Sequence, residues 1–208
     1  MNPRRAPARS PLLPAPERIA YGDLPIPTPH TAHELAALLR LLTDHRHPRL
    51  HSIAIGHSRD DASRAAAAAF ADAWHATDGA ILTVVDWPEQ AASWLRPAHH
   101  LTAQEPDALV IAAAPLGWTQ LARRLRHSTP WRPNRTFGFA SLAEPAVAAL
   151  AGTGVLDGVR GASADGGTWR IDHGGCRINH NPQLPWSFLT HTGLTIHPPH
   201  PPNLRKDQ

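Results

Sequence analysis

The chain has 208 residues, of which 42% are hydrophobic and 18% charged, so it can bury one core but is too short for two ordinary domains. Its formal net charge is only +3, and its arginines are scattered rather than gathered on one element with interleaved aromatic residues, which argues against a nucleic-acid-binding protein. The single cysteine excludes an internal disulfide and fits a reducing compartment.

The two ends of the chain are rich in proline. We expect residues 1–26 to form a flexible Pro/Arg-rich tail, because the prolines interrupt both a helix and the apolar core of an export signal. Residues 182–208 predict a second tail, rich in Pro and His. No apolar run approaches the roughly 18 to 20 residues that cross a bilayer. We therefore expect a soluble, cytoplasmic protein that does not associate with membranes.

The first half of the chain alternates helices and strands. Thr31 and Glu34 have the spacing of a capping box and begin a helix over 31–46. Apolar strands are expected at 50–55 and 80–85, and a helix over 62–77, capped by Asp60 or Asp61, lies between them. Pro88 then opens a helix over 89–103.

The alternation continues in the second half. Strands are expected at 107–113, 136–140 and 154–161. A turn at 115–118 leads into a helix that carries Leu121 and Leu125, and a further helix covers 142–151. Strands that alternate with helices imply right-handed crossovers and a parallel sheet. The sequence thus predicts an α/β domain over 27–181, a doubly wound, three-layer, mainly parallel sheet of about five strands with a C-terminal β-hairpin.

The hairpin is expected over 168–180, around Gly174 and Gly175. Pairing His173 with Cys176 places Asp172 opposite Arg177, and Ile171 opposite Ile178.

A metal site is the alternative for this region, because His173, Cys176 and His180 are residues that zinc prefers. His180, however, lies four strand residues beyond Cys176, roughly 13 Å at about 3.3 Å per residue, so a structural hairpin is favoured. Phosphate-binding glycine loops are absent from the sequence, and we expect no cofactor.

The order of features from 27 to 161 resembles the second lobe of type I periplasmic-type substrate-binding proteins, in particular the branched-chain amino-acid family of ABC transporters. The resemblance rests on Ser52 to Gly56, Asp78-Gly79 before a Val-rich strand, Glu105 to Ile111, and Asp157 to Gly161. It implies a Rossmann-like domain that corresponds to the second lobe, without the first lobe that these proteins also have. A homodimer, or a separate lobe from another chain, is then expected to complete it.

In such sheets ligands gather beyond the carboxyl ends of the strands. The candidate ligand-binding residues in those loops are His57, Ser58, Arg59, Asp60, Pro115 and Ser141. The alternative reading is that Ser58 and Asp60 only cap a helix.

The first functional hypothesis is therefore a non-enzymatic module that senses or binds a small polar ligand such as an amino acid. The second is a scaffold or assembly protein that binds another protein through exposed Trp118 and Trp131 and through the hairpin. A small hydrolase-like enzyme, with His57 as a base, is the third.

Overall fold

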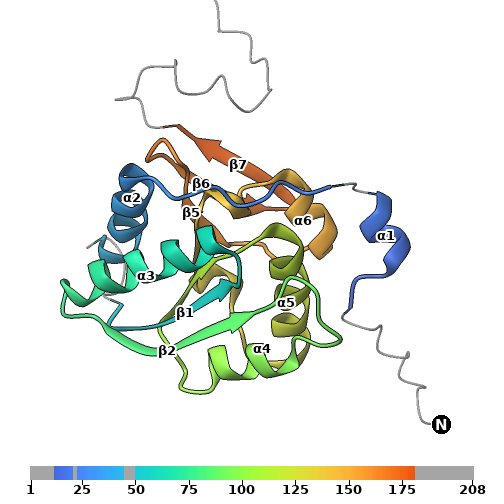
Figure 1. Ribbon diagram of the computed structural model, residues 1–208, viewed down its shortest axis with the longest axis horizontal. Helices are drawn as coiled ribbons and strands as arrows, with labels where there is room; N and C mark the ends of the chain where they lie inside the picture. Colours follow the sequence, from blue (N-terminus) through green and yellow to red (C-terminus); the bar gives the residue numbers. More distant parts are fainter. Residues whose placement is uncertain (1–11, 21–22, 45–49, 181–208) are drawn as a thin grey trace, which may run out of the picture.

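Seven strands form one sheet within residues 12–20, 23–44 and 50–180, the part of the chain that the computed structural model describes (Figure 1). Their order is β2-β1-β3-β4-β5-β6-β7, with β1 to β5 parallel and β6 and β7 antiparallel. The bounds are β1 (Ser52–Ser58), β2 (Ala80–Trp87), β3 (Ala108–Ala112), β4 (Thr136–Gly138), β5 (Arg160–Ala162), β6 (Thr168–Asp172) and β7 (Gly175–Asn179). The predicted fold class, five parallel strands followed by a hairpin, is confirmed.

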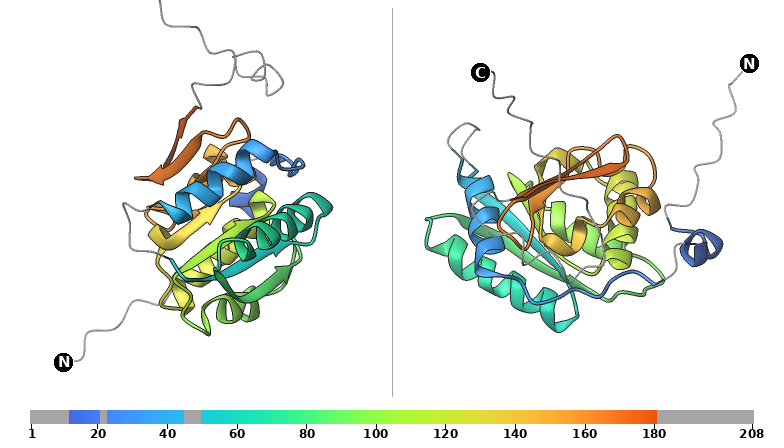
Figure 2. Two further views of the ribbon diagram at one scale, coloured as in Figure 1. Left: turned by 90° about the vertical axis from the view of Figure 1, so that its left-hand side faces the viewer. Right: turned by 90° about the horizontal axis from the view of Figure 1, so that it is seen from above.

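Helices cover both faces of the sheet (Figures 1 and 2). The described helices are α1 (Ala15–Ala20), α2 (Ala32–Thr43), α3 (Asp61–His75), α4 (Leu95–Thr102), α5 (Pro115–Ser128) and α6 (Pro145–Ala151), with 3-10 turns at Pro133–Arg135 and Ala140–Leu142. Helices α2 and α3 bury their apolar side chains on one face, and α4, α5 and α6 bury theirs on the other. None of these helices is long and apolar enough to serve as a membrane span.

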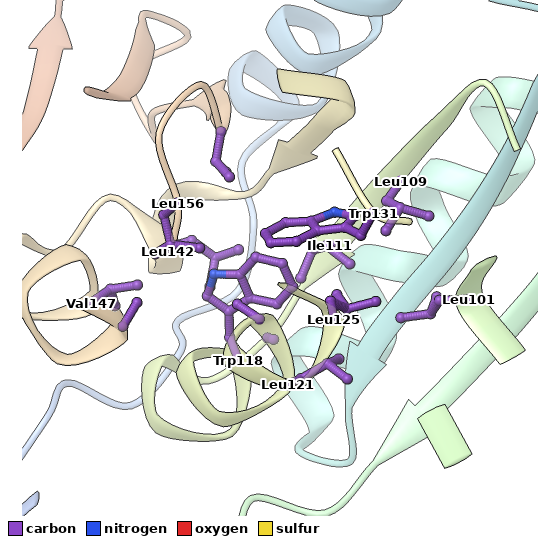
Figure 3. Close-up of a cluster of buried hydrophobic side chains, with 14 of the residues drawn as sticks. Leu101, Leu109, Ile111, Trp118, Leu121, Leu125, Trp131, Leu142, Val147 and Leu156 are labelled. Carbon is purple, nitrogen blue, oxygen red and sulfur yellow. The ribbon is translucent and has the colours of Figure 1, made fainter. Parts of the chain in front are cut away.

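The core on the α5 side is built around two tryptophans (Figure 3). Trp118 is 0% exposed and Trp131 is 6% exposed, and their ring centroids lie 6.2 Å apart, edge to face. The indole of Trp131 donates its N–H to the hydroxyl of Thr136 at 2.8 Å. The expectation that these two side chains form an exposed partner surface is therefore wrong, because the core buries them.

Several predicted boundaries move for local reasons. The helix expected over 89–103 begins only at Leu95, and residues 88–91, which were expected in its first turn, line clefts instead. The turn expected at 115–118 is the first turn of α5, where proline is well suited to the first helical position. Strand β5 is confined to Arg160–Ala162, since Gly152, Gly154 and Gly158 before it adopt positive φ in turns.

The hairpin forms one residue earlier than predicted. Asp172 pairs with Gly175, and Ile171 pairs with Cys176. The two turn residues are His173 and Gly174, with φ of 52° and 74°, as a type I′ turn requires. This pairing differs from the predicted one by two residues, so Ile171 and Ile178 remain on the same face. Arg177 still approaches Asp172, at 3.9 Å across the diagonal.

The predicted tails are only partly described. Within 1–26, residues 15–20 form α1, and Leu13 before this helix is buried at 7% exposure, whereas Ile19 is 74% exposed. Residues 1–11 and 182–208 lie outside the described residues.

Trp169 joins the hairpin to the parallel part of the sheet. It is 1% exposed, pairs with Gly161 and donates its indole N–H to the carbonyl of Ala162 at 2.9 Å. A Cβ on Gly161 would lie 2.5 Å from this indole and 1.9 Å from the carbonyl oxygen of Gly138. Only glycine at position 161 therefore lets the ring lie against the sheet.

We expect Gly161→Ala to lower the free energy of unfolding by about 1 to 3 kcal/mol or more, because backbone and a rigid ring must move to admit one methyl group. Urea unfolding followed by tryptophan fluorescence measures this loss. The matched control is Gly175→Ala in β7, where the nearest atom to an added Cβ is 3.7 Å away. Equal stability of the two variants would contradict the packing described here.

Candidate functional site

The sheet changes its direction of winding between β1 and β3. The chain passes from β1 to β2 on one side and then crosses to β3 on the other side of β1. At such a switch point the loops after the two strands diverge and leave a crevice where α/β proteins bind ligands. A cleft of about 860 Å³ opens there, and residues after β1, β2 and β3 form one of its walls: Ser58, Arg59, Asp60, Pro88, Glu89, Gln90, Ala114, Pro115 and Leu116.

The hydroxyl of Ser58 ties the two diverging strands together. Ser58 is 1% exposed and accepts the backbone N–H of Ala114 at 2.8 Å. It donates to Asp60 Oδ2 at 2.5 Å and lies 3.1 Å from the hydroxyl of Ser63. The donor and acceptor positions of this hydroxyl are all used within the protein. Ser58 therefore forms part of the floor of the cleft and has no hydrogen bond left for a ligand.

Asp60 begins helix α3. Its Oδ1 accepts the backbone N–H of Ser63 at 2.8 Å, as an N-cap does. Burial alone raises the pKa of Asp60, but hydrogen bonds from Ser58 and Ser63 outweigh it and hold the pKa below its usual value. Asp60 is therefore an ionised cap at the cleft, and the capping alternative is correct for its carboxylate.

Arg59 lies at the open rim. Its guanidinium is 3.1 Å from the carboxylate of Asp86, and the two side chains are 59% and 50% exposed. An exposed pair of this kind contributes little to stability. The guanidinium is thus held loosely and can bind an anionic group.

Glu89 is the site residue that the sequence analysis missed. Glu89 follows β2, whose carboxyl end lies at the same edge of the sheet as those of β1 and β3. The expectation that ligands gather beyond the carboxyl ends of strands would therefore have identified Glu89 if it had been applied to β2. Its Oε1 accepts the backbone N–H of Gly117 in the first turn of α5 at 2.7 Å, whereas its buried Oε2 has no hydrogen-bond partner. Burial, with help from the nearby charge of Asp60, raises the pKa of Glu89.

Gly117 makes room for this carboxyl group. A Cβ at Gly117 would lie 2.5 Å from Glu89 Oε2. The cleft therefore holds two carboxyl groups whose pKa values are displaced in opposite directions, Asp60 downward and Glu89 upward.

The structure brings four of the six predicted residues together in the cleft: Ser58, Arg59, Asp60 and Pro115. The other two lie elsewhere. The ring of His57 contacts the carbonyl of Ser58, with Nδ1 at 2.9 Å, and is not part of the cleft lining. Ser141 donates to the carbonyl of Ala113 at 2.8 Å and borders a separate cavity of about 30 Å³.

Glu34 shares that small cavity. It is 3% exposed, and its Oε1 accepts the backbone N–H of Ala140 while Oε2 accepts that of Thr31 at 3.3 Å. Burial raises the pKa of this carboxyl group. Glu34 thus fastens α2 to the loop after β4, beside Ser141.

The metal candidates do not converge. Within the described residues, no three His, Cys, Asp or Glu side chains form a group suited to a metal ion. His173 occupies the hairpin turn, and His180 Nδ1 lies 3.0 Å from Asp165. Burial raises the pKa of the Cys176 thiol to about 11, with a contribution from the carboxylate of Glu144. Cys176 is therefore a thiol packed in the hairpin.

Comparison with known proteins shows the fold. No family model matches the chain, and no curated protein matches it. Among solved structures it is similar to a branched-chain amino-acid ABC transporter protein from Rhodospirillum rubrum, with 21% identity, a TM-score of 0.53 and 65% of this chain covered. A counterpart from Silicibacter pomeroyi has 18% identity, a TM-score of 0.54 and 70% of this chain covered. A substrate-binding periplasmic protein from Ralstonia solanacearum has 18% identity, a TM-score of 0.53 and 66% covered.

The matched region is 37% of each of these three proteins. The chain therefore has the fold of one lobe of a periplasmic-type binding protein, as the resemblance in its sequence implied.

We expect Ser58→Ala to lower the free energy of unfolding by about 1 to 3 kcal/mol, because the buried N–H of Ala114 loses its acceptor. The folded-state pKa of Asp60 should also rise. A carboxyl whose folded pKa is depressed stabilises above its unfolded pKa and loses that contribution as pH falls through the folded pKa. Acid unfolding of the variant should consequently begin at higher pH than in the wild type.

Circular dichroism from pH 7 to pH 2 follows this transition. Ser141→Ala is the control, since the one bond described for its hydroxyl is a donation to a carbonyl, and its acid transition should match that of the wild type.

For Glu89→Gln the opposite pH dependence is expected. The folded pKa of Glu89 is raised above its ordinary 4.5, so its contribution is fully present below pH 4.5 and is lost as pH rises through the folded pKa. The amide does not ionise, so the free energy of unfolding of the variant should rise relative to that of the wild type as pH increases from 4 to 8. Urea unfolding at each pH measures both proteins, and parallel curves would refute the assignment.

Proposed function

We propose that this chain is a non-enzymatic binding module that holds a small polar ligand, such as an amino acid, in the cleft at the carboxyl ends of β1, β2 and β3. The observation that carries the proposal is Glu89, a half-buried side chain at the crevice of the switch point whose buried Oε2 has no hydrogen-bond partner among the described residues. The neighbour from Ralstonia solanacearum is named a substrate-binding periplasmic protein, which supports ligand binding as the use of this fold.

The cleft suggests how the ligand is oriented. The carboxyl torsion of a glutamate is soft, so a ligand N–H donor can draw Oε2 of Glu89 away from Gly117 and supply its missing partner. Leu116 and Leu150 provide apolar lining for an aliphatic side chain. Arg59 at the rim is positioned to receive a carboxylate.

Acid–base catalysis is the alternative that the opposed pKa values of Asp60 and Glu89 favour. Asp60, however, uses one oxygen for the hydroxyl of Ser58 and the other for the N–H of Ser63. A carboxylate engaged in this way is a poor proton acceptor. Binding therefore accounts for the site better than catalysis.

A cytoplasmic setting is part of the proposal. It is supported by the single cysteine, Cys176, which leaves no internal disulfide to be preserved in an oxidising compartment.

The test uses L-leucine, L-leucinamide, which keeps the ammonium and lacks the carboxylate, and 4-methylpentanoate, which lacks the ammonium. L-Leucine and L-leucinamide should raise the melting temperature, because a ligand at a hundredfold excess over its Kd stabilises the native state by about 2.7 kcal/mol. The fatty acid should not. Arg59→Ala should abolish any preference for leucine over leucinamide.

In the same test, Glu89→Gln should weaken leucinamide binding at least tenfold by isothermal titration calorimetry. Glu105→Gln, the same change at an exposed position before β3, should bind as the wild type does. Failure of all three compounds to bind, or unchanged affinity in Glu89→Gln, would overturn the proposal.

A further inference from the structure

The second wall of the cleft comes from the N-terminal segment of the same chain. This segment, hereafter the strap, comprises the described residues 12–20 and 23–30 and crosses the molecule from α1 to α2 (Figure 1). Its residues Ile19 and Asp23 to Pro27 face the strand ends across the cleft, as part of one continuous lining.

The strap is fastened at both ends. At one end Leu13 is 7% exposed and donates its backbone N–H to Gln120 Oε1 of α5 at 2.8 Å, a buried hydrogen bond. At the other end Thr31 donates its hydroxyl to the carbonyl of Ala164 at 2.6 Å and caps α2. Each fastening lies outside the large cleft, so the cleft sits under the span between them.

The span itself is poorly packed. Ile19 is 74% exposed and Ile26 is 83% exposed, although both belong to the lining of the cleft. Large aliphatic side chains gain stability when they leave water, and these two find too little to pack against in the protein alone. Pro25, Pro27 and Pro29 keep the span extended, which lowers the entropy lost when it closes on something.

The strap also alters the charge of the cleft. It adds the carboxylate of Asp23 to those of Asp60 and Glu89. Against these three carboxyl groups, the described lining of the cleft carries one guanidinium, that of Arg59 at the rim. The complete cleft is therefore acidic with apolar walls, which suits a ligand that carries an ammonium group and an aliphatic body.

We propose that the strap is a built-in cover that replaces the missing lobe, and that it closes the cleft over an aliphatic ligand bearing an ammonium group, with Leu24 and Ile26 packing on the ligand. This inference rests on the proposed function for its ligand, but the covering itself is a property of the unliganded chain. The sequence had suggested a second copy or a separate lobe for this place. The strap makes neither necessary.

The covering is tested without ligand through a reporter thiol at Leu116, which lines the cleft and the groove under Leu12 and Leu13. In a Cys176→Ser background, Leu116→Cys is alkylated by a charged maleimide, with and without Leu13→Asp, which releases the strap from its buried anchor. We expect release to speed alkylation at least tenfold. Asp72→Cys, on the exposed side of α3, is the control and should react equally fast in both backgrounds.

A second release variant guards against general unfolding. Gln120→Leu removes the acceptor of the Leu13 N–H while it keeps a buried side chain of similar size, and circular dichroism checks that both release variants remain folded. An unchanged alkylation rate of Leu116→Cys in a folded release variant would contradict the proposal that the strap covers the cleft.

Measuring ligand binding by the release variants distinguishes a failure of this inference from a failure of the proposed function. With L-leucinamide as probe, release of the strap should raise the dissociation constant at least tenfold, mainly through faster dissociation in stopped flow. Faster alkylation together with unchanged affinity would overturn the claim that the strap contacts the ligand. Faster alkylation with no binding of any of the three compounds by the wild type would overturn the proposed function and leave the cover supported.

Discussion

The carboxyl end of the sheet depends on one buried hydroxyl group. Strands β1 and β3 must diverge there because the chain reverses its winding between them, and Ser58 bridges the divergence through the N–H of Ala114. The same hydroxyl donates to Asp60, which caps α3. The floor of the cleft, the start of a helix and the low pKa of Asp60 therefore share a single side chain, and the site has a rigid base without any contribution from a ligand.

Glu89 has the opposite character. It reaches from the loop after β2 to the first turn of α5, where its carboxyl group serves as a cap supplied from a distance. Gly117 leaves the space that this group occupies. One oxygen is satisfied and the other is buried without a partner, an arrangement whose cost a bound N–H donor removes. The cleft thus combines Ser58, whose hydrogen-bonding groups all have partners, with Glu89, which has one oxygen left to accept a donor.

The open side of the cleft raises a problem that two-lobed binding proteins solve with a second domain. Here the chain spans only 37% of the length of the Rhodospirillum rubrum and Silicibacter pomeroyi proteins. The strap meets the same physical requirement, exclusion of water from the ligand, with a short extended segment held at two points. The exposed side chains of Ile19 and Ile26 are then residues that lack a packing partner in the unliganded protein, rather than ordinary surface residues.

Local patterns in the sequence determined the alternation of strands and helices, the capping box at Thr31 and Glu34, the cap at Asp60 and the existence of the hairpin. Each depends on residues within a few positions of one another, and their periodicity is legible without the fold. The hairpin register was predicted incorrectly, since His173 and Gly174 together satisfy a type I′ turn and the glycine pair alone does not reveal which two residues form it. Tertiary structure alone decided that Trp118 and Trp131 face the core, that Glu89 meets Gly117, and that Ile19 and residues 23–27 line the cleft at the strand ends. These contacts join segments far apart in the chain, and their energies come from burial and desolvation, which exist only once the layers have packed.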